Sequence, residues 1–313
     1  MQTTNATRNA TDVTKSVYID DPANVHGAVH RILTQRYPDY SFAKLEILFN
    51  DLARLYRGEY PGFHACETAY HDLQHVLDVT LATARLLDGY EAAHSADEQL
   101  GPELSLLAVI VAMFHDSGYI RRMADRKHKH GAEYTRIHVG RSARFMSEYL
   151  PTVGMKKLAN LASTLVHFTG YEVSPDKLAV TAYKHSVVGA LVGTADVLAQ
   201  MADSQYLRKC YQNLYNEFEI GGIARQQNPD GSTTVIYSSA HELLQKTPDF
   251  MQQIVNNRLD GYFDGRYRYA GVHFGGDNLY MKALLKNRQE LRQIIRKAAN
   301  SEADFETALA KVA

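Results

Sequence analysis

The most constraining feature of this sequence is an apolar run that ends in two adjacent polar residues. Residues 104–114 are almost unbroken in their hydrophobicity, and His115 and Asp116 follow directly. The 11 residues of the run are too few to cross a membrane, because a spanning helix needs roughly 20. A helix that is apolar on every side is buried, so the run predicts a helix at the centre of a protein core.

The polar end of this run requires a partner. A histidine and a carboxylate at the end of a buried helix cost several kcal/mol unless they are paired or bound to a metal ion. Ten of the 14 histidines lie between His64 and His185, about twice what uniform scatter would place there. This segment is therefore enriched in side chains that bind metals and exchange protons near neutral pH.

Charge and cysteine content exclude several classes of function. A net charge of −1 and a pI of about 6.9 provide no basic surface for a nucleic-acid polymer, so we expect none as partner. The two cysteines, Cys66 and Cys210, lack Cys-x-x-Cys spacing, which excludes a disulfide scaffold and a thiolate zinc site. The polar N-terminus lacks the apolar core of a signal peptide. We therefore expect a cytoplasmic protein that does not bind membranes.

The periodicity predicts an all-α protein with one short hairpin. We expect a flexible N-terminal arm over residues 1–20, which are rich in Thr and Asn, a helical core over 21–220, and a C-terminal elaboration over 221–313. An Asp-Gly turn before β-branched residues predicts the hairpin at 225–237, and 261–276 is expected to be an ordered loop. Helices are predicted at about 22–37, 41–55, 69–89, 104–114, 130–150, 155–168, 175–218, 240–258 and 276–298.

Metal-ligating residues recur once per predicted helix. An antiparallel bundle returns to the same layer every two or three dozen residues, so one inward residue from each helix can converge with the others. Imidazole and carboxylate ligands suit Fe, Mn, Zn or Mg. His128 and His130 are alternatives to His138 in this pattern. The candidates, in chain order, are His75, His115, Asp116, His138, His167 and Asp196.

The order of these residues resembles the HD superfamily of metal-dependent phosphohydrolases. Tyr70-His71-Asp72-x-x-His75 is similar to the Tyr-His-Asn-x-x-His signature of 3′,5′-cyclic-nucleotide phosphodiesterases, and the resemblance extends over about 69–218. It implies an HD-domain helical bundle with a C-terminal α extension. It also implies two divalent metal ions of unknown identity. One ion would be held by His75, His115, Asp116 and Asp196, and His138 and His167 would serve the second ion, with Asp116 bridging.

By this resemblance the protein hydrolyses a phosphodiester of a small nucleotide, above all a 3′,5′-cyclic nucleotide. A metal-activated hydroxide would attack phosphorus, Asp116 would hold both ions, and His71 would protonate the leaving oxygen as general acid. Three alternatives stay open. They are a phosphohydrolase acting on nucleotide phosphomonoesters or anhydrides, an HD-type di-iron oxygenase, and a nucleotide sensor without turnover.

Two positions depart from the family pattern. Asp72 stands where the family has Asn, and Tyr119 stands where cyclic-nucleotide phosphodiesterases usually have histidine and the oxygenase relatives lysine. We predict that Tyr119 donates a hydrogen bond to the substrate phosphate. Lys184 is predicted to supply its positive charge, with Arg121, Arg122 and Arg208 as alternatives, and Gln200, four residues after Asp196, is predicted to face the pocket.

The C-terminal aromatic residues could wall a base-binding pocket, although packing is the commoner role for such side chains. The sequence leaves open whether the protein is a homodimer. The aromatic candidates are Tyr262, Phe263, Tyr267, Tyr269, Phe274 and Tyr280.

Overall fold

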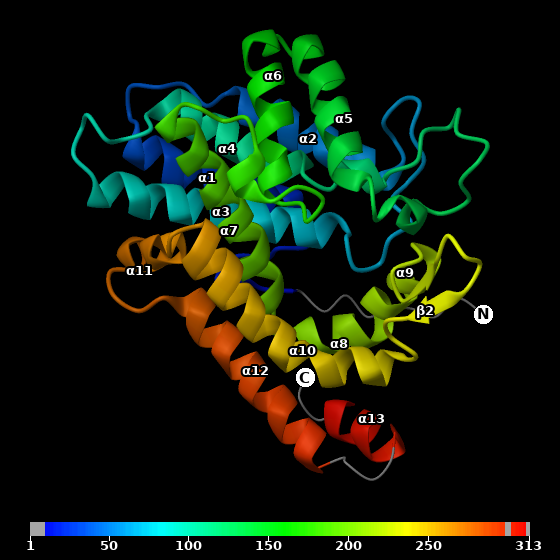
Figure 1. Cartoon of the computed structure of the whole chain (residues 1–313). Helices are drawn as coiled ribbons and strands as arrows, with labels where there is room; N and C mark the ends of the chain where they lie inside the picture. Colours follow the sequence, from blue (N-terminus) through cyan, green and yellow to red (C-terminus); the bar gives the residue numbers. More distant parts are fainter. Residues whose placement is uncertain (1–9, 298–301, 311–313) are drawn as a thin grey trace.

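The fold comes from a computed structural model of the chain, which describes residues 10–297 and 302–310 (Figure 1). It is all-α apart from one two-stranded sheet, as the sequence predicts. The α-helices are α1 Pro22–Arg36, α2 Lys44–Arg57, α3 Leu73–Ala93, α4 Pro102–Phe114, α5 His138–Thr152, α6 Lys156–Leu165, α7 Tyr183–Ala202, α8 Tyr206–Lys209, α9 Tyr215–Ile220, α10 Ala240–Ile254, α11 Tyr269–His273, α12 Leu279–Lys297 and α13 Glu302–Ala310. The short elements are η1 Ser117–Tyr119, η2 Gly131–Tyr134, η3 Val166–Phe168, η4 Pro175–Lys177, η5 Cys210–Leu214, η6 Val255–Tyr262, η7 Arg266–Arg268, β1 Arg225–Gln227 and β2 Thr233–Val235.

The apolar run forms α4, in the interior of the molecule. α2, α3, α6 and α7 all pack against it, and residues 105–114 are all buried. Gly101, with φ of +82°, and Pro102 begin the helix, which fits the preference of proline for a first helical position. Because α4 is covered on its sides, His115 and Asp116 at its C-terminal end are held inside the protein.

The helix α3 packs on α1, α4, α7 and α11. The sequence predicts its end near Gly89, and that boundary is wrong, because α3 continues to Ala93. A Cβ atom at Gly89 would lie 1.8 Å from the carbonyl oxygen of Tyr269, on α11. This glycine therefore allows two backbones to approach closely and does not terminate the helix.

The prediction of a flexible arm over residues 1–20 is wrong for its second half. Residues 1–9 of that arm lie outside the described residues, but residues 10–20 are ordered. The Asp12 carboxylate accepts hydrogen bonds from the backbone N–H groups of Thr14, Ser16 and Val17 and from the guanidinium of Arg85 on α3. A buried guanidinium needs a counter-ion, so burial of Arg85 requires this segment to fold onto the core.

Two of the predicted helices begin eight residues later than expected, at His138 and at Tyr183. The helix predicted over 130–150 begins at His138, because His130 caps the separate turn η2. It then runs to Thr152, with Pro151 in its last turn. The long segment predicted from Pro175 forms only the short η4 there, and α7 begins at Tyr183.

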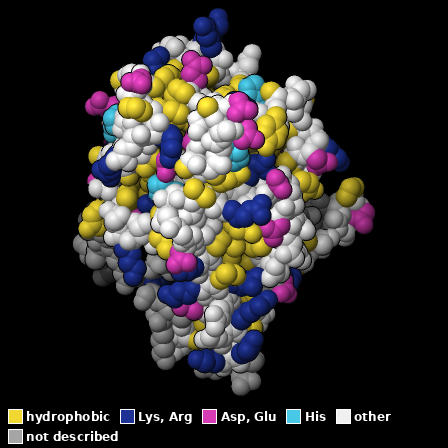
Figure 2. All heavy atoms as spheres, turned by 90° about the vertical axis from the view of Figure 1, so that its left-hand side faces the viewer, with side chains coloured by type: hydrophobic (Ala, Val, Ile, Leu, Met, Phe, Trp, Pro, Cys, Tyr) yellow, Lys and Arg dark blue, Asp and Glu magenta, His cyan; other side chains and the backbone are white. Residues whose placement is uncertain are grey.

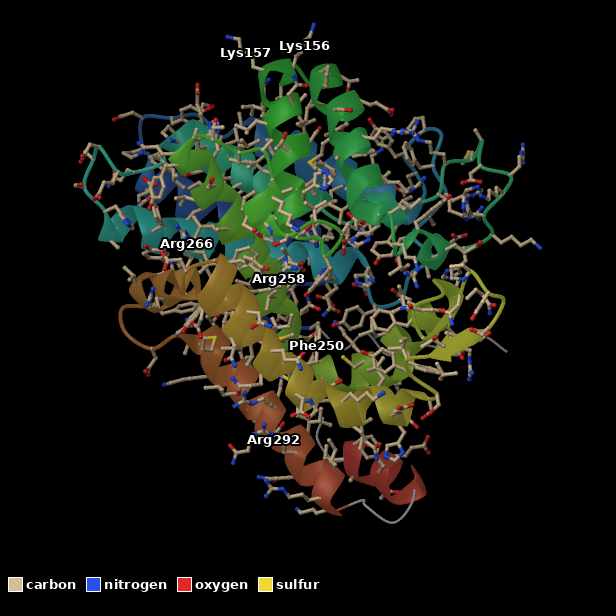
Figure 3. The ribbon with its side chains drawn as sticks, in the orientation of Figure 1. Lys156, Lys157, Phe250, Arg258, Arg266 and Arg292 are labelled. Carbon is tan, nitrogen blue, oxygen red and sulfur yellow. The ribbon has the colours of Figure 1, made fainter. Side chains whose placement is uncertain are left out.

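The C-terminal part of the chain forms a second layer, below the core in Figure 1. α11 packs on α3, and α12 packs on α7. The buried Arg258 of η6 donates to the carbonyl oxygens of Phe168 and Gly170 and lies between the two layers in Figure 3. The predicted hairpin is confirmed, with Arg225 opposite Val235, whereas 261–276 is partly helical because η7 and α11 form there.

The surface carries charges of both signs. On the face that Figure 2 shows, acidic and basic side chains are interspersed, with hydrophobic side chains between them. On α12, Lys282 pairs with Asp277, and Lys286 pairs with Glu290. None of the described helices is both long and apolar enough to cross a membrane.

Candidate metal centre and pocket

Four predicted ligands converge where α3, α4 and α7 meet. His75 lies in the first turn of α3, His115 and Asp116 follow α4, and Asp196 lies on α7. The Nε2 atom of His75 lies 3.3 Å from Asp116 Oδ2 and 3.5 Å from Asp196 Oδ1. The Nε2 atom of His115 lies 3.3 and 3.6 Å from the same two oxygens. All four residues are buried.

This geometry fits a metal ion. Two ligand atoms bound to one ion at about 2.1 Å lie about 3.0–3.4 Å apart in octahedral or tetrahedral coordination, close to the separations observed. His115 Nε2 and Asp116 Oδ2 are buried without a hydrogen-bond partner, although buried polar atoms are almost always satisfied. His75, His115 and Asp116 therefore form a group that could hold a metal ion, and Asp196 lies beside it.

Electrostatics favour a cation at the same point. Burial alone would lower the pKa of His75, but the carboxylates of Asp116 and Asp196 raise it to about 9. Burial likewise opposes ionisation of Asp116, yet His115 and His75 hold the pKa of its carboxyl well below the usual range. Without a metal, a proton is thus retained among these ligands. A divalent cation would replace it, since histidine binds metals in its neutral form.

His138 lies on the other side of Asp116. Its Nε2 atom is 3.5 Å from Asp116 Oδ1, whereas His75 and His115 face Oδ2. Burial lowers the pKa of His138, so its ring is neutral near pH 7. Each oxygen of the Asp116 carboxylate thus faces a different set of histidines, as a bridging ligand would.

The other predicted histidines lie apart from this cluster. His167, in η3, has no hydrogen bond, ion pair or ring contact with the cluster among the described residues, so its role as a ligand stays a prediction. His128, an alternative to His138, instead pairs with Asp125. His130, the other alternative, accepts from the backbone N–H of Ala132. Of His128, His130 and His138, only His138 pairs with Asp116.

His71 forms a pair with a carboxylate that the sequence reasoning missed. Its Nδ1 atom donates to Glu217 Oε2 at 2.6 Å, and the backbone N–H of Tyr70 donates to Glu217 Oε1 at 2.6 Å. Glu217 lies on α9 and is buried. A usable signal was present in the sequence, because Glu217 continues the inward spacing of Tyr206, Cys210 and Leu214.

Tyr119 lies between two histidines. Its ring stacks on His71 at a centroid distance of 4.5 Å and on His138 at 4.4 Å. The tyrosine is buried and lines the pocket. Donation of a hydrogen bond from Tyr119 to the substrate phosphate stays a prediction. Its packing between the two rings sets the spacing between His71 and His138. Asp72, the other departure from the family pattern, caps α3 by accepting from the backbone N–H of His75.

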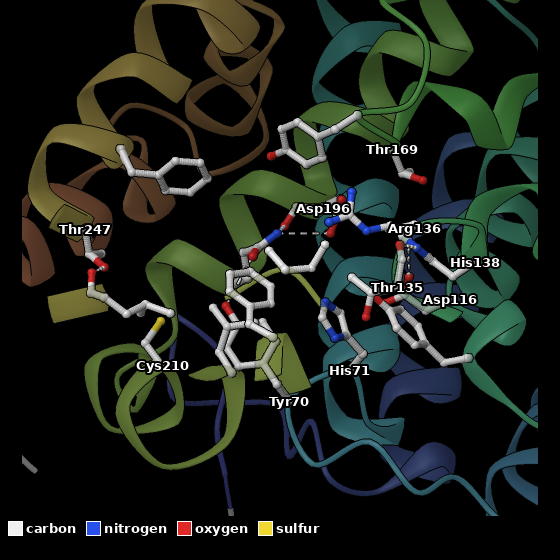
Figure 4. A pocket seen from close by; sticks show the side chains of 18 of the residues that line it. Tyr70, His71, Asp116, Thr135, Arg136, His138, Thr169, Asp196, Cys210 and Thr247 are labelled. Carbon is white, nitrogen blue, oxygen red and sulfur yellow. Dashed lines mark hydrogen bonds and ion pairs between the residues drawn. The ribbon is translucent and has the colours of Figure 1, made fainter. Parts of the chain in front are cut away.

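A pocket of about 490 Å³ opens over the cluster. Figure 4 shows His71, Asp116 and His138 on one side of it, and Cys210 and Thr247 on the other. Arg136 and Lys246 also line the pocket and are exposed. The aromatic residues that line it are Tyr70, Tyr119, Tyr171, Tyr206, Phe218, Tyr237 and Phe250.

The C-terminal aromatic residues proposed as a base-binding wall do not line this pocket. Phe263 and Tyr280 are fully buried and pack in the second layer, so packing is the role that the structure supports. The C-terminal layer contributes instead through α10, whose Leu243, Thr247 and Phe250 reach the pocket. Arg136 and the α10 residues were missed because their approach to the site depends on contacts between distant segments.

The two remaining predicted substrate residues differ in outcome. Gln200 lines the pocket, and its Nε2 atom donates to Asp196 Oδ1 at 3.2 Å. Lys184 does not line the pocket, which contradicts its predicted contact with phosphate. It lies in the first turn of α7, 12 residues before Asp196, and donates to the carbonyl oxygen of Gln99.

The alternative cations are also outside the pocket. Arg121 pairs with Glu67, and Arg122 pairs with Glu148. Arg208 does not line the pocket either. Arg136, which lies two residues before His138, is therefore the cation nearest in sequence to the cluster among the residues that line the pocket.

Comparison with known proteins identifies the family. The family profile described as Npun_R2479-like matches residues 61–264. That span covers more than half of the chain and includes every residue from His71 to Phe250 discussed for the pocket. The chain belongs to the Npun_R2479-like family. Searches of curated proteins and of solved structures gave no significant match.

Proposed function

We propose that this member of the Npun_R2479-like family is a metal-dependent phosphohydrolase, related in chemistry to the HD superfamily. One observation carries the proposal. His75, His115, Asp116 and Asp196 converge, and all of them except His75 line a pocket that also presents His71, whose orientation Glu217 fixes. A metal cluster beside a positioned proton donor is the arrangement that hydrolysis of an anionic ester requires.

The proposed centre is binuclear. His75, His115 and Asp196 would hold one ion with Asp116 Oδ2, and His138 would contact the second with Asp116 Oδ1. When bound, divalent ions supply Lewis acidity and lower the pKa of a coordinated water. Because His167 makes no contact with these residues among those described, the ligands proposed for the second ion are His138 and Asp116.

The residues around the centre would transfer a proton, hold His71 in position and bind the phosphate. Glu217 accepts from His71 Nδ1, which leaves Nε2 of the same ring to exchange a proton with the leaving oxygen. Tyr119 stacks on His71 and keeps the ring from rotating. Arg136 is exposed at the pocket wall, where its guanidinium can bind a phosphate oxygen in the geometry that arginine favours.

The proposed substrate is a small nucleotide, above all a 3′,5′-cyclic nucleotide. The pocket volume of about 490 Å³ lies within the range of roughly 300–1,000 Å³ that small-molecule sites occupy. Tyr171, Tyr237 and Phe250 line the pocket and offer flat apolar surfaces on which a base can stack.

The test begins with the metal content of the purified protein. The stripped protein is then reloaded with Mn, Fe, Zn or Mg and assayed against cyclic nucleotides, nucleoside monophosphates and nucleoside triphosphates, with oxygen uptake recorded in parallel. We expect hydrolysis of a cyclic nucleotide that is lost in His115→Ala and retained in His128→Ala, a matched histidine outside the pocket. Oxygen uptake coupled to substrate loss, or hydrolysis limited to monoesters or anhydrides, would contradict this proposal in favour of the corresponding alternative.

A further inference from the structure

The histidines around the centre differ in what their Nδ1 atoms contact. Nδ1 of His115 donates to the carbonyl oxygen of Ala112 at 2.8 Å, and Nδ1 of His138 donates to that of Thr135 at 2.7 Å. His75 directs Nε2 to the carboxylates of Asp116 and Asp196. Its Nδ1 atom has no hydrogen-bond partner among the described residues. A metal-ligating histidine almost always donates its second N–H to an acceptor, which fixes the tautomer and the ring orientation.

His75 also lines a small cavity. It measures about 10 Å³ and is lined by His75, Asp78, Gln200, Asp203 and Lys209, among others. That volume is about the space that one water molecule needs, and a buried water also needs two to four polar partners. The cavity is separate from the larger pocket, although the two share the lining residues Tyr70, Gln200 and Tyr206.

Asp78 is the unusual residue of this cavity. It lies one turn after His75 on α3, is only 6% exposed, and its Oδ1 atom is buried without a hydrogen-bond partner. Lys209 lines the same cavity, but its ammonium pairs with Asp203 at 2.6 Å. Burial raises the pKa of Asp78 to about 7, as expected for a carboxylate that no protein group satisfies.

We propose that one water molecule occupies this cavity and links His75 Nδ1–H to the Asp78 carboxylate, which makes Asp78 a positioning residue for a metal ligand. The water would accept from Nδ1 and donate to Asp78 Oδ1. This satisfies two groups that otherwise lack partners, and it holds His75 in the tautomer whose Nε2 lone pair faces the ion. The inference rests on the proposed metal centre.

Asp78→Asn tests this inference, because the amide keeps the shape of the side chain and removes the negative charge. Metal affinity is measured by competition with a chelator, and the stability of the metal-free protein by chemical denaturation. We expect the affinity for Zn²⁺ or Mn²⁺ to fall about 10- to 100-fold, the usual effect of losing the outer partner of a ligating histidine. The metal-free protein should be no less stable, since the substitution removes a buried carboxylate that has no protein partner.

Asp88→Asn is the matched control on the same helix. Asp88 accepts from Arg36 and His273, so this variant should lose stability and keep the metal affinity of the wild type. If Asp78→Asn binds metal within twofold of the wild type, or loses affinity and metal-free stability together, Asp78 does not position His75. A wild-type protein that binds no metal would overturn the proposed centre as well.

Discussion

Buried polar side chains lie at two places along α3, and they differ in whether their polar atoms have hydrogen-bond partners. At one end, Arg85 donates to Asp12 and to the hydroxyl of Tyr280, and Asp12 is further satisfied by backbone N–H groups. At the other end, Asp78 Oδ1 on α3 and the neighbouring His115 Nε2 and Asp116 Oδ2, which follow α4, are equally buried and have no hydrogen-bond partner among the described residues.

Whether buried polar atoms have partners distinguishes a pair that stabilises the fold from a group that could bind an ion. A buried ion pair that serves the fold closes on itself, because a lone buried charge destabilises the folded state. A centre built to bind an ion leaves its ligand atoms facing a common point. We call the Arg85–Asp12 pair the closed end and the group around His115, Asp116 and Asp78 the open end. We expect substitutions at the closed end to lower the free energy of unfolding, and substitutions at the open end to change metal affinity or the rate of hydrolysis.

Asp116→Asn should give the largest effect. The amide fills the same volume but cannot bridge two cations, so the Lewis-acid contribution of several kcal/mol is lost and kcat/KM should fall about 10³-fold or more. The measurements are metal content and hydrolysis rate, with circular dichroism to verify the fold. A folded Asp116→Asn protein with wild-type activity would show that the cluster is not the reaction centre.

Asp12→Ala should affect stability at the closed end. It leaves the Arg85 guanidinium buried without its counter-ion, which typically costs about 3–5 kcal/mol. Chemical denaturation measures the loss, and the metal affinity of the folded protein should not change. Asp20→Ala is the control, since Asp20 is exposed in the same segment and should change stability by less than about 0.5 kcal/mol.

The same variant predicts a pH dependence. Burial alone would raise the pKa of Asp12, but Arg85 and several hydrogen bonds give a net lowering. A lowered pKa stabilises the folded state above the ordinary value of about 3.9, and the stabilisation is lost as the pH falls through the lowered value. The stability difference between wild type and Asp12→Ala should be full at pH 7 and narrow below about pH 4. A constant difference down to pH 2 would contradict this role.

The comparison also explains what the sequence could predict. The central helix and the convergence of His75, His115, Asp116 and Asp196 were predictable, because an apolar run must be buried and because inward residues spaced one per helix return to one layer. Gly89 was misread, since only the approach of Tyr269 on α11 makes a glycine necessary inside α3. Asp12 was placed in a flexible arm because its partner, Arg85, lies 73 residues away.

The open end was predictable only in part, for the same reason. The spacing of Glu217 after Leu214 indicates that it points inward, but not that it reaches His71, which lies 146 residues away in the sequence. Lys184 and Asp196 share a helix, and that shared helix led to a wrong prediction for Lys184. The 12 residues between them on α7 separate the two positions by about 18 Å along the helix axis, since each residue adds about 1.5 Å.

Glu217→Gln should give an intermediate effect at the open end. The amide can still contact His71 Nδ1 but no longer provides a charged acceptor, so the ring loses its fixed tautomer. We expect kcat to fall about 10- to 100-fold, a part of the roughly 10²–10⁴-fold that a positioned general acid contributes. Metal content should be unchanged, because Glu217 contacts His71 and not a predicted ligand. Glu219→Gln, an exposed neighbour on α9, is the control, and equal rates in the two variants would exclude the proposed role of Glu217.

Lys184→Ala should give the smallest effect. Its ammonium donates to the carbonyl oxygen of Gln99, at the end of α7 remote from Asp196, so KM for the nucleotide should stay within about twofold of the wild type. Arg136→Ala is the matched comparison, since this cation does line the pocket. We expect KM to rise about tenfold in that variant, the loss of about 1.4 kcal/mol of ground-state binding. Steady-state kinetics of the two variants thus decides which cation binds the phosphate. A large rise in KM for Lys184→Ala alone would mean that the first turn of α7 moves into the pocket when substrate binds.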